Sequence, residues 1–187
     1  MKTRRKGHNM KVEVVYASMS GSTRKLAQGI YDALSGCDKR IVDLAHEQPD
    51  SDADVLLLGY WVDKGAPCER IKQFMSTVSG KYVGVFCTLG YYCDTAHARA
   101  ALDAGIDAVK DNNTILGSYI CNGAMNSALI ERFRARGAAT PQNELRWQLF
   151  AEHPTQAEIA LAGERFNERI ELLRMFQSQG LEFTSIM

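Results

Sequence analysis

The chain has 187 residues, of which 45% are hydrophobic and 24% are charged, and its 22 basic and 22 acidic side chains give a formal net charge of zero. This length favours one domain with a sizeable core. The neutral charge argues against nucleic acid or an anionic membrane as the main partner, because both usually require a basic excess, and no apolar run approaches the ~20 residues of a membrane helix.

Residues 1–9, MKTRRKGHN, are basic and are not followed by the apolar run of a signal peptide. We therefore predict an N-terminal arm, then a single domain over residues 10–187, in a cytoplasmic protein. Five cysteines, an odd number without C-x-x-C spacing, favour reduced thiols over disulfides. The four histidines are scattered, which argues against a metal site.

Along the rest of the chain, apolar runs typical of β-strands alternate with helical patterns. The predicted strands are Val12–Ala17, Arg40–Leu44, Asp54–Trp61, Tyr82–Cys87 and Thr114–Cys121. The predicted helical segments are Leu26–Leu34, Ile71–Val78, Thr95–Val109, Ala128–Phe133, Glu144–Phe150 and Thr155–Phe176. This alternation predicts an α/β fold in which a parallel sheet is covered by helices on both faces. A ligand is then expected at the carboxyl ends of the strands.

The last helical pattern is the longest. It begins with the capping-box sequence TQAE, in which Thr155 and Glu158 are expected to bond each other's backbone amides. Its apolar positions recur at helical spacing, so one stripe should face the sheet. That stripe consists of Ile159, Ala162, Phe166, Ile170 and Leu173.

The loop after the first strand reads SMSGST, Ser18–Thr23. Its backbone N–H groups can converge on an anion at the start of the next helix, and Gly21 allows the backbone to approach that anion closely. Further hydrogen-bond donors would be the hydroxyls of Ser18, Ser20, Ser22 and Thr23. The lysine of a P-loop is missing, and neither the dinucleotide glycine pattern nor the G-x-S-x-G elbow is present, so a monophosphate fits best. Alternatively, the hydroxyls only cap the helix.

Aromatic residues follow two later strands. In GYWVDKG, Gly59–Gly65, Tyr60 and Trp61 stand at a strand end where no core residue is required, and in TLGYYCD, Thr88–Asp94, Tyr91 and Tyr92 follow Gly90. Two aromatic loops flanking a phosphate loop suit a flat, conjugated ring held by stacking. The alternative is that Trp61 caps the sheet edge and the tyrosines are ordinary surface residues.

These loops resemble those of flavodoxins. The pattern [TS]-x-[TS]-G-x-T is occupied by Ser18, Ser20, Gly21 and Thr23, and the segments WVDKG, TLGYYCD, ICNG and HPT are similar to those of flavodoxin-domain proteins of anaerobic bacteria. Some of those proteins serve as accessories to reductases, including bilirubin reductase. The resemblance implies a three-layer sandwich with a five-stranded parallel sheet of order 2-1-3-4-5. Two features depart from the family: the net charge is zero rather than acidic, and extra helical segments precede the last helix.

The resemblance also implies the cofactor FMN, with its phosphate on the first loop and its ring between the other two. No catalytic residue and no metal ligand are implied. An aromatic stack disfavours the anionic reduced flavin, whereas the ammonium of Lys64 would stabilise it, unless Lys64 is only a solvated surface residue. The residues implied to contact FMN are Ser18, Met19, Ser20, Gly21, Ser22, Thr23, Tyr60, Trp61, Val62, Asp63, Lys64, Gly65, Thr88, Leu89, Gly90, Tyr91, Tyr92 and Asp94.

Two unrelated activities are disfavoured. Cys93 and Arg99 have the C-x₅-R spacing of tyrosine phosphatases, but the segment leads into an alanine-rich helix and Ala100 stands where serine or threonine is needed. A phospho-receiver domain needs acidic residues at the ends of the first and third strands, where this chain has Ala17–Ser18 and Tyr60–Trp61.

Three functional hypotheses follow. The leading one is an FMN-binding electron-transfer protein that donates electrons to a partner reductase or another acceptor. The second is an NAD(P)H-dependent quinone or flavin reductase on the same scaffold, and the third is a binding module without flavin. A homodimer is left open, because quinone reductases of this fold complete their sites across subunits.

Overall fold

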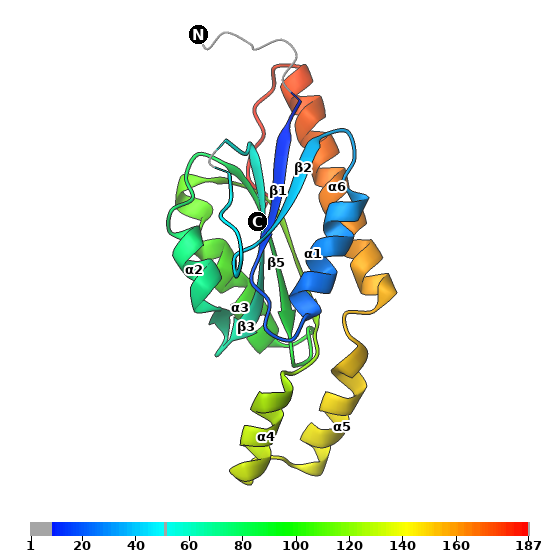
Figure 1. Ribbon diagram of the computed structural model, residues 1–187. Coiled ribbons are helices and arrows are strands. Elements are labelled where there is room, and N and C mark those ends of the chain that lie inside the picture. The colour runs from blue at the N-terminus through cyan, green and yellow to red at the C-terminus, as the bar shows by residue number, and fades with distance from the viewer. Residues whose placement is uncertain (1–8, 51, 187) are drawn as a thin grey trace.

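The computed structural model describes residues 9–50 and 52–186, so the predicted N-terminal arm lies outside the described residues except for Asn9. Five parallel strands form the sheet in the order β2-β1-β3-β5-β6, and β4 pairs with β3 in the antiparallel direction (Figure 1). The parallel strands therefore have the predicted order. The strands are β1 (Lys11–Tyr16), β2 (Asp38–Asp43), β3 (Val55–Asp63), β4 (Ala66–Pro67), β5 (Tyr82–Leu89) and β6 (Thr114–Asn122).

Helices cover both faces of this sheet. Helices α1 and α6 lie on one face of the sheet, and α2 and α3 lie on the other (Figure 1). Their buried side chains belong to two core clusters, one on each face. The helices are α1 (Ser22–Ala33), α2 (Glu69–Met75), α3 (Ala96–Asp107), α4 (Ser127–Ala135), α5 (Pro141–Leu149) and α6 (Gln156–Ser178), with 3₁₀ turns η1 (Lys110–Asn112) and η2 (Phe150–Glu152). Within the part of the chain that the structure describes, no helix is long and apolar enough to cross a membrane.

Helix α6 fits the predicted stripe. Ala162, Phe166, Ile170 and Leu173 are buried, Ile159 packs at the margin of the same cluster, and the capping box of Thr155 and Glu158 is present. A Cβ at Gly163 would come within 2.6 Å of the Ala33 Cβ, so α6 packs closely against α1. The stripe thus places α6 against the sheet, and the capping box marks where the helix begins.

The short strand β4 was not predicted. Strand β3 continues past Trp61 to Asp63, and the chain then reverses through Lys64 (φ 50°) and Gly65 (φ 81°) into β4. Two successive residues with positive φ are what a type I′ hairpin turn requires. A two-residue strand is too short to show a pattern in the sequence.

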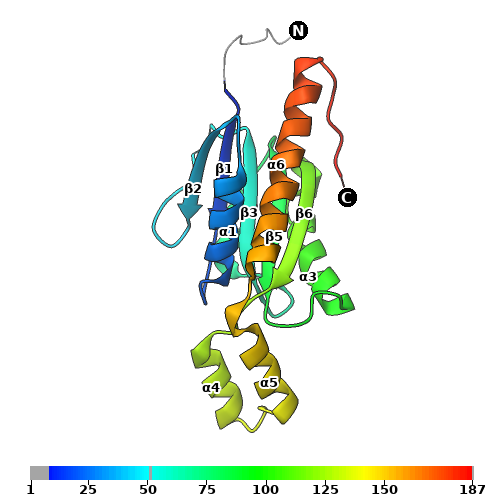
Figure 2. The ribbon, with the colours of Figure 1, turned by 90° about the vertical axis from the view of Figure 1, so that its right-hand side faces the viewer.

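Helices α4 and α5 form a hairpin that extends beyond the carboxyl ends of the strands (Figures 1 and 2). The rings of Phe133 and Trp147 stack between the two helices at 5.9 Å and 26°, and Arg134 forms an ion pair with Glu144 at 2.6 Å. Both helical segments were predicted, but their placement against the sheet was not. Because of this placement, the hairpin faces the loops that were predicted to bind a ligand.

Candidate functional site

The loop after β1 turns through Gly21, whose φ of 93° lies in the left-handed region that favours glycine. The Ser18 hydroxyl oxygen accepts hydrogen bonds from the backbone amides of Gly21 (3.2 Å) and Arg24 (3.3 Å). The first amides of α1 have no acceptor inside the helix, and the helix dipole makes this end positive. The loop therefore presents a helix N-terminus at the edge of the sheet where a ligand was expected.

Two of the four hydroxyls in this loop bond to other elements, whereas those of Ser18 and Ser20 bond only within the loop and the start of α1. The Ser22 hydroxyl accepts a hydrogen bond from the Ala124 amide (2.9 Å) and donates one to the His153 carbonyl (3.1 Å). The buried Thr23 hydroxyl lies 2.9 Å from that of Thr88, at the end of β5. Both tie the loop to other elements, so Ser18 and Ser20 are the hydroxyls nearer to solvent.

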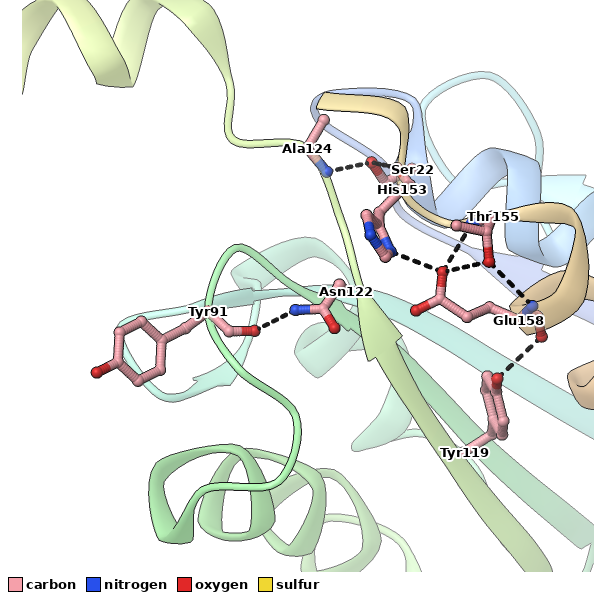
Figure 3. A network of polar contacts seen from close by, with 8 residues as sticks. All are labelled: Ser22, Tyr91, Tyr119, Asn122, Ala124, His153, Thr155 and Glu158. Atoms are coloured by element: carbon pink, nitrogen blue, oxygen red, sulfur yellow. Dashed lines mark hydrogen bonds and ion pairs between the residues drawn. The ribbon is translucent and has the colours of Figure 1, made fainter. Parts of the chain in front are cut away.

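The same network holds both ends of the α4–α5 hairpin in place (Figure 3). Before α4, the Asn122 amide group donates to the Tyr91 carbonyl at 2.6 Å. After α5, His153 Nδ1 lies 2.7 Å from the Glu158 carboxylate, and the Tyr119 hydroxyl donates to the Glu158 carbonyl at 2.9 Å. Contacts between residues far apart in the sequence thus fix the hairpin over the carboxyl ends of the strands.

Replacing Ser22 with alanine is expected to lower the free energy of unfolding by about 1–3 kcal/mol, because the Ala124 amide and the His153 carbonyl lose a buried partner. Urea denaturation followed by circular dichroism measures this change. The matched control is Ser20→Ala, which removes an exposed hydroxyl from the same loop and should change stability by less than ~0.5 kcal/mol. Equal losses in the two variants would contradict the structural role of Ser22.

Two neighbouring aromatic residues near the end of β3 have different surroundings. Tyr60 is fully buried under α3 and donates a hydrogen bond to the Ala101 carbonyl at 2.8 Å, and burial raises the pKa of its hydroxyl. The expectation that no core residue is needed here is thus wrong for Tyr60, since its ring belongs to the core. Trp61, on the opposite face of the strand, is only half-buried and is exposed to the cleft described below.

The two tyrosines of the loop after β5 contact each other edge-on, with ring centres 5.4 Å apart, but they have different further partners. Tyr91 is exposed, and the Arg146 guanidinium of α5 lies 4.7 Å from the centre of its ring. Tyr92 packs edge-on against Phe150 of η2 at 5.4 Å. Tyr91 therefore belongs to the cleft, whereas Tyr92 packs against the linker that leads to α6.

These loops and the hairpin enclose a cleft of about 1070 Å³. The predicted residues that line it are Met19, Trp61, Val62, Asp63, Lys64, Gly65, Leu89, Gly90 and Tyr91. A smaller cavity of about 60 Å³ shares several of these walls and adds the predicted residues Ser20 and Thr88. The other predicted residues line neither cavity: Ser18, Gly21, Ser22, Thr23, Tyr60, Tyr92 and Asp94.

The hairpin forms one wall of the cleft, and this wall was not predicted from the sequence. The residues that it and its flanks contribute are Met125, Asn126, Ala128, Leu129, Arg132, Phe133, Arg136 and Arg146, and His97 of α3 is a further addition. The three arginines were visible in the sequence, but their helices were predicted only as short segments without a position. Only the fold brings them into the same cleft as Trp61 and Tyr91.

Cys93 does not have the properties of a phosphatase nucleophile. Burial, followed by the nearby carboxylates of Glu158 and Asp94, raises the pKa of its thiol to about 12. A reactive cysteine needs a lowered pKa, so that the thiolate forms at neutral pH. Among the described residues, no group of three or more histidine, cysteine, aspartate or glutamate side chains could hold a metal ion.

Comparisons with known proteins agree with this geometry. The model of the Flavodoxin domain family matches residues 13–167. The flavodoxin-like domain-containing protein BilS of Clostridioides difficile (strain CD3) is 32% identical over 161 residues, which cover 80% of this chain and 90% of that protein.

Two solved flavodoxins share the fold. A flavodoxin from the domain Archaea matches with a TM-score of 0.57 and 15% identity, over 88% of this chain and 99% of its own. The two-electron reduced flavodoxin of Megasphaera elsdenii matches with a TM-score of 0.54 and 23% identity, over 84% of this chain and 98% of its own.

Proposed function

Because the chain belongs to the Flavodoxin domain family, we propose that it binds FMN in the cleft and passes electrons to a partner protein, either a reductase or another acceptor. The observation that carries this proposal is the cleft itself. It lies at the carboxyl ends of parallel strands and is lined by Trp61 near the end of β3 and by Tyr91 of the loop after β5. We further propose that residues 10–187 act as one domain in the cytoplasm.

The residues present fit the cofactor. A volume of about 1070 Å³ is slightly larger than the ~300–1,000 Å³ range typical of small-molecule sites, so the cleft has room for a flavin. Half-buried Trp61 offers its ring to a flat ligand, and Tyr91, with the Arg146 guanidinium over its ring, lines the same cleft. Ser20 reaches the adjoining small cavity from the helix N-terminus, which supports a phosphate group at that end.

The bound flavin would supply the electron chemistry. This chain's own residues would bind and orient it: Trp61 and Tyr91 by packing against the ring, and Ser20 by reaching the phosphate from the loop before α1. Lys64 stands in a tight turn at the cleft, where its positive charge favours added negative charge. Exposed Met19 and Tyr91 at the rim would contact the partner protein.

Anaerobic reduction tests the role of carrier. Protein loaded with FMN should keep its visible flavin absorbance when mixed with NADPH alone, lose it on photochemical reduction, and regain it when cytochrome c is added as an artificial acceptor. Rapid loss of absorbance with NADPH alone would contradict the carrier role and indicate an NAD(P)H-dependent reductase. Gel filtration of the same loaded protein would show whether a homodimer forms.

A further inference from the structure

The cleft has more positive than negative side chains among its lining residues. Arg132 of α4, Arg136 just after it and Arg146 of α5 all line the cleft, together with Lys64 on the opposite side. Asp63 is the carboxylate among the lining residues. Since the whole chain has a formal net charge of zero, positive charge is concentrated in this cleft.

These arginines differ from their neighbour Arg134. Arg134 points to carboxylates and forms ion pairs with Glu131 and Glu144. Among the described residues, Arg132 and Arg136 have no such partner, although like charges four residues apart on a helix repel each other. An anion in the cleft would remove this repulsion.

Arg146 provides a separate observation. Its guanidinium lies over the Tyr91 ring, and its Nε atom is buried without a hydrogen-bond partner in the described part of the chain. Buried donors in proteins are normally paired, so an unpaired donor beside a cleft points to a missing acceptor. A planar guanidinium matches the oxygens of a carboxylate or a phosphate.

The rest of the wall is apolar. Met125, Leu129 and Phe133 line the cleft beside the arginines, and such a concave surface suits a small molecule. We propose that the arginine wall binds a second ligand, an organic anion whose carboxylate or phosphate group pairs with Arg132, Arg136 and Arg146 and whose apolar body packs on Leu129 and Phe133. This inference rests on the proposed function only in assigning the opposite wall to the flavin.

Isothermal titration calorimetry tests the inference with three probes of similar size: 2-naphthoate, 1-naphthyl phosphate and the neutral 2-naphthalenemethanol. Each is titrated into FMN-loaded protein and into FMN-free protein. At least one anion should bind at least tenfold more tightly than the neutral probe, and its affinity should fall as salt is added. The stronger of the two anions identifies the preferred head group.

Variants then locate the site. The double change Arg132→Gln and Arg136→Gln should weaken binding of the anion at least tenfold and leave FMN affinity unchanged. Arg99→Gln, the same chemical change at an exposed position of α3 outside the cleft, should change anion binding by less than twofold. Thermal unfolding by circular dichroism confirms that each variant is folded.

Three results would overturn the inference: equal affinity for the neutral and anionic probes, unchanged anion binding in the double variant, or a loss of FMN affinity in that variant. The last would mean that the arginines hold the phosphate of the cofactor itself. FMN binding without anion binding would refute this inference alone. Anion binding by protein that does not take up FMN would support it while refuting the proposed function.

Discussion

Replacing Trp61 with alanine is expected to weaken FMN binding by about tenfold to a hundredfold, because the ring loses both buried area and stacking, together about 1.5–3 kcal/mol. Trp61 lines the cleft and is only half-buried, so its loss should leave the sheet intact. Titration of protein into FMN, followed by flavin fluorescence, gives the dissociation constant.

Two further variants separate stacking from general damage. Trp61→Phe keeps a ring in place and should retain affinity to within about tenfold of the unchanged protein. Tyr31→Ala removes an aromatic residue of α1 that lines neither cavity and should not alter FMN binding. Unchanged FMN affinity in Trp61→Ala would contradict the proposed position of the flavin ring.

Replacing Phe166 with alanine is expected to lower the free energy of unfolding by about 3–5 kcal/mol. This ring is fully buried between α6 and the sheet, 6.1 Å from the ring of Phe86 at an angle of 62°, and a Cβ at Gly84 would come within 2.6 Å of it. At ~2–4 °C per kcal/mol for a chain of this size, the melting temperature should fall by roughly 6–20 °C.

The control for Phe166→Ala is Leu161→Ala on the same helix. Leu161 is half exposed, so its truncation should change the free energy of unfolding by less than ~0.5 kcal/mol. Thermal and urea denaturation of both variants provide the comparison. Similar losses in the two would contradict the packing of α6 through the predicted stripe.

The sheet could be predicted because its central strands are nearly continuous apolar runs, such as Asp54–Trp61, as expected of strands covered on both faces. Helix α6 could be predicted because its stripe and capping box are local patterns. Tyr60 could not be assigned correctly, since its burial depends on α3 lying across the strand. Gly105 of α3 makes room there: a Cβ at this position would meet the Tyr60 ring at 2.7 Å.

The hairpin wall could not be predicted for a similar reason. Its position depends on pairs such as Ser22 with Ala124 and Tyr119 with Glu158, which join segments 102 and 39 residues apart. Periodicity within α4 or α5 contains no information about these contacts. The motifs on which the resemblance to flavodoxins depends contain none of the arginines of the hairpin.

The most direct test of FMN binding is a titration of the purified protein with FMN after removal of any bound flavin, followed by flavin and tryptophan fluorescence. Saturation at one FMN per chain, with quenching of both signals in the unchanged protein and weaker binding in Trp61→Ala, is the predicted result. Flavin fluorescence that stays unchanged throughout, with all FMN recovered free after filtration, would contradict the proposal that the protein binds FMN.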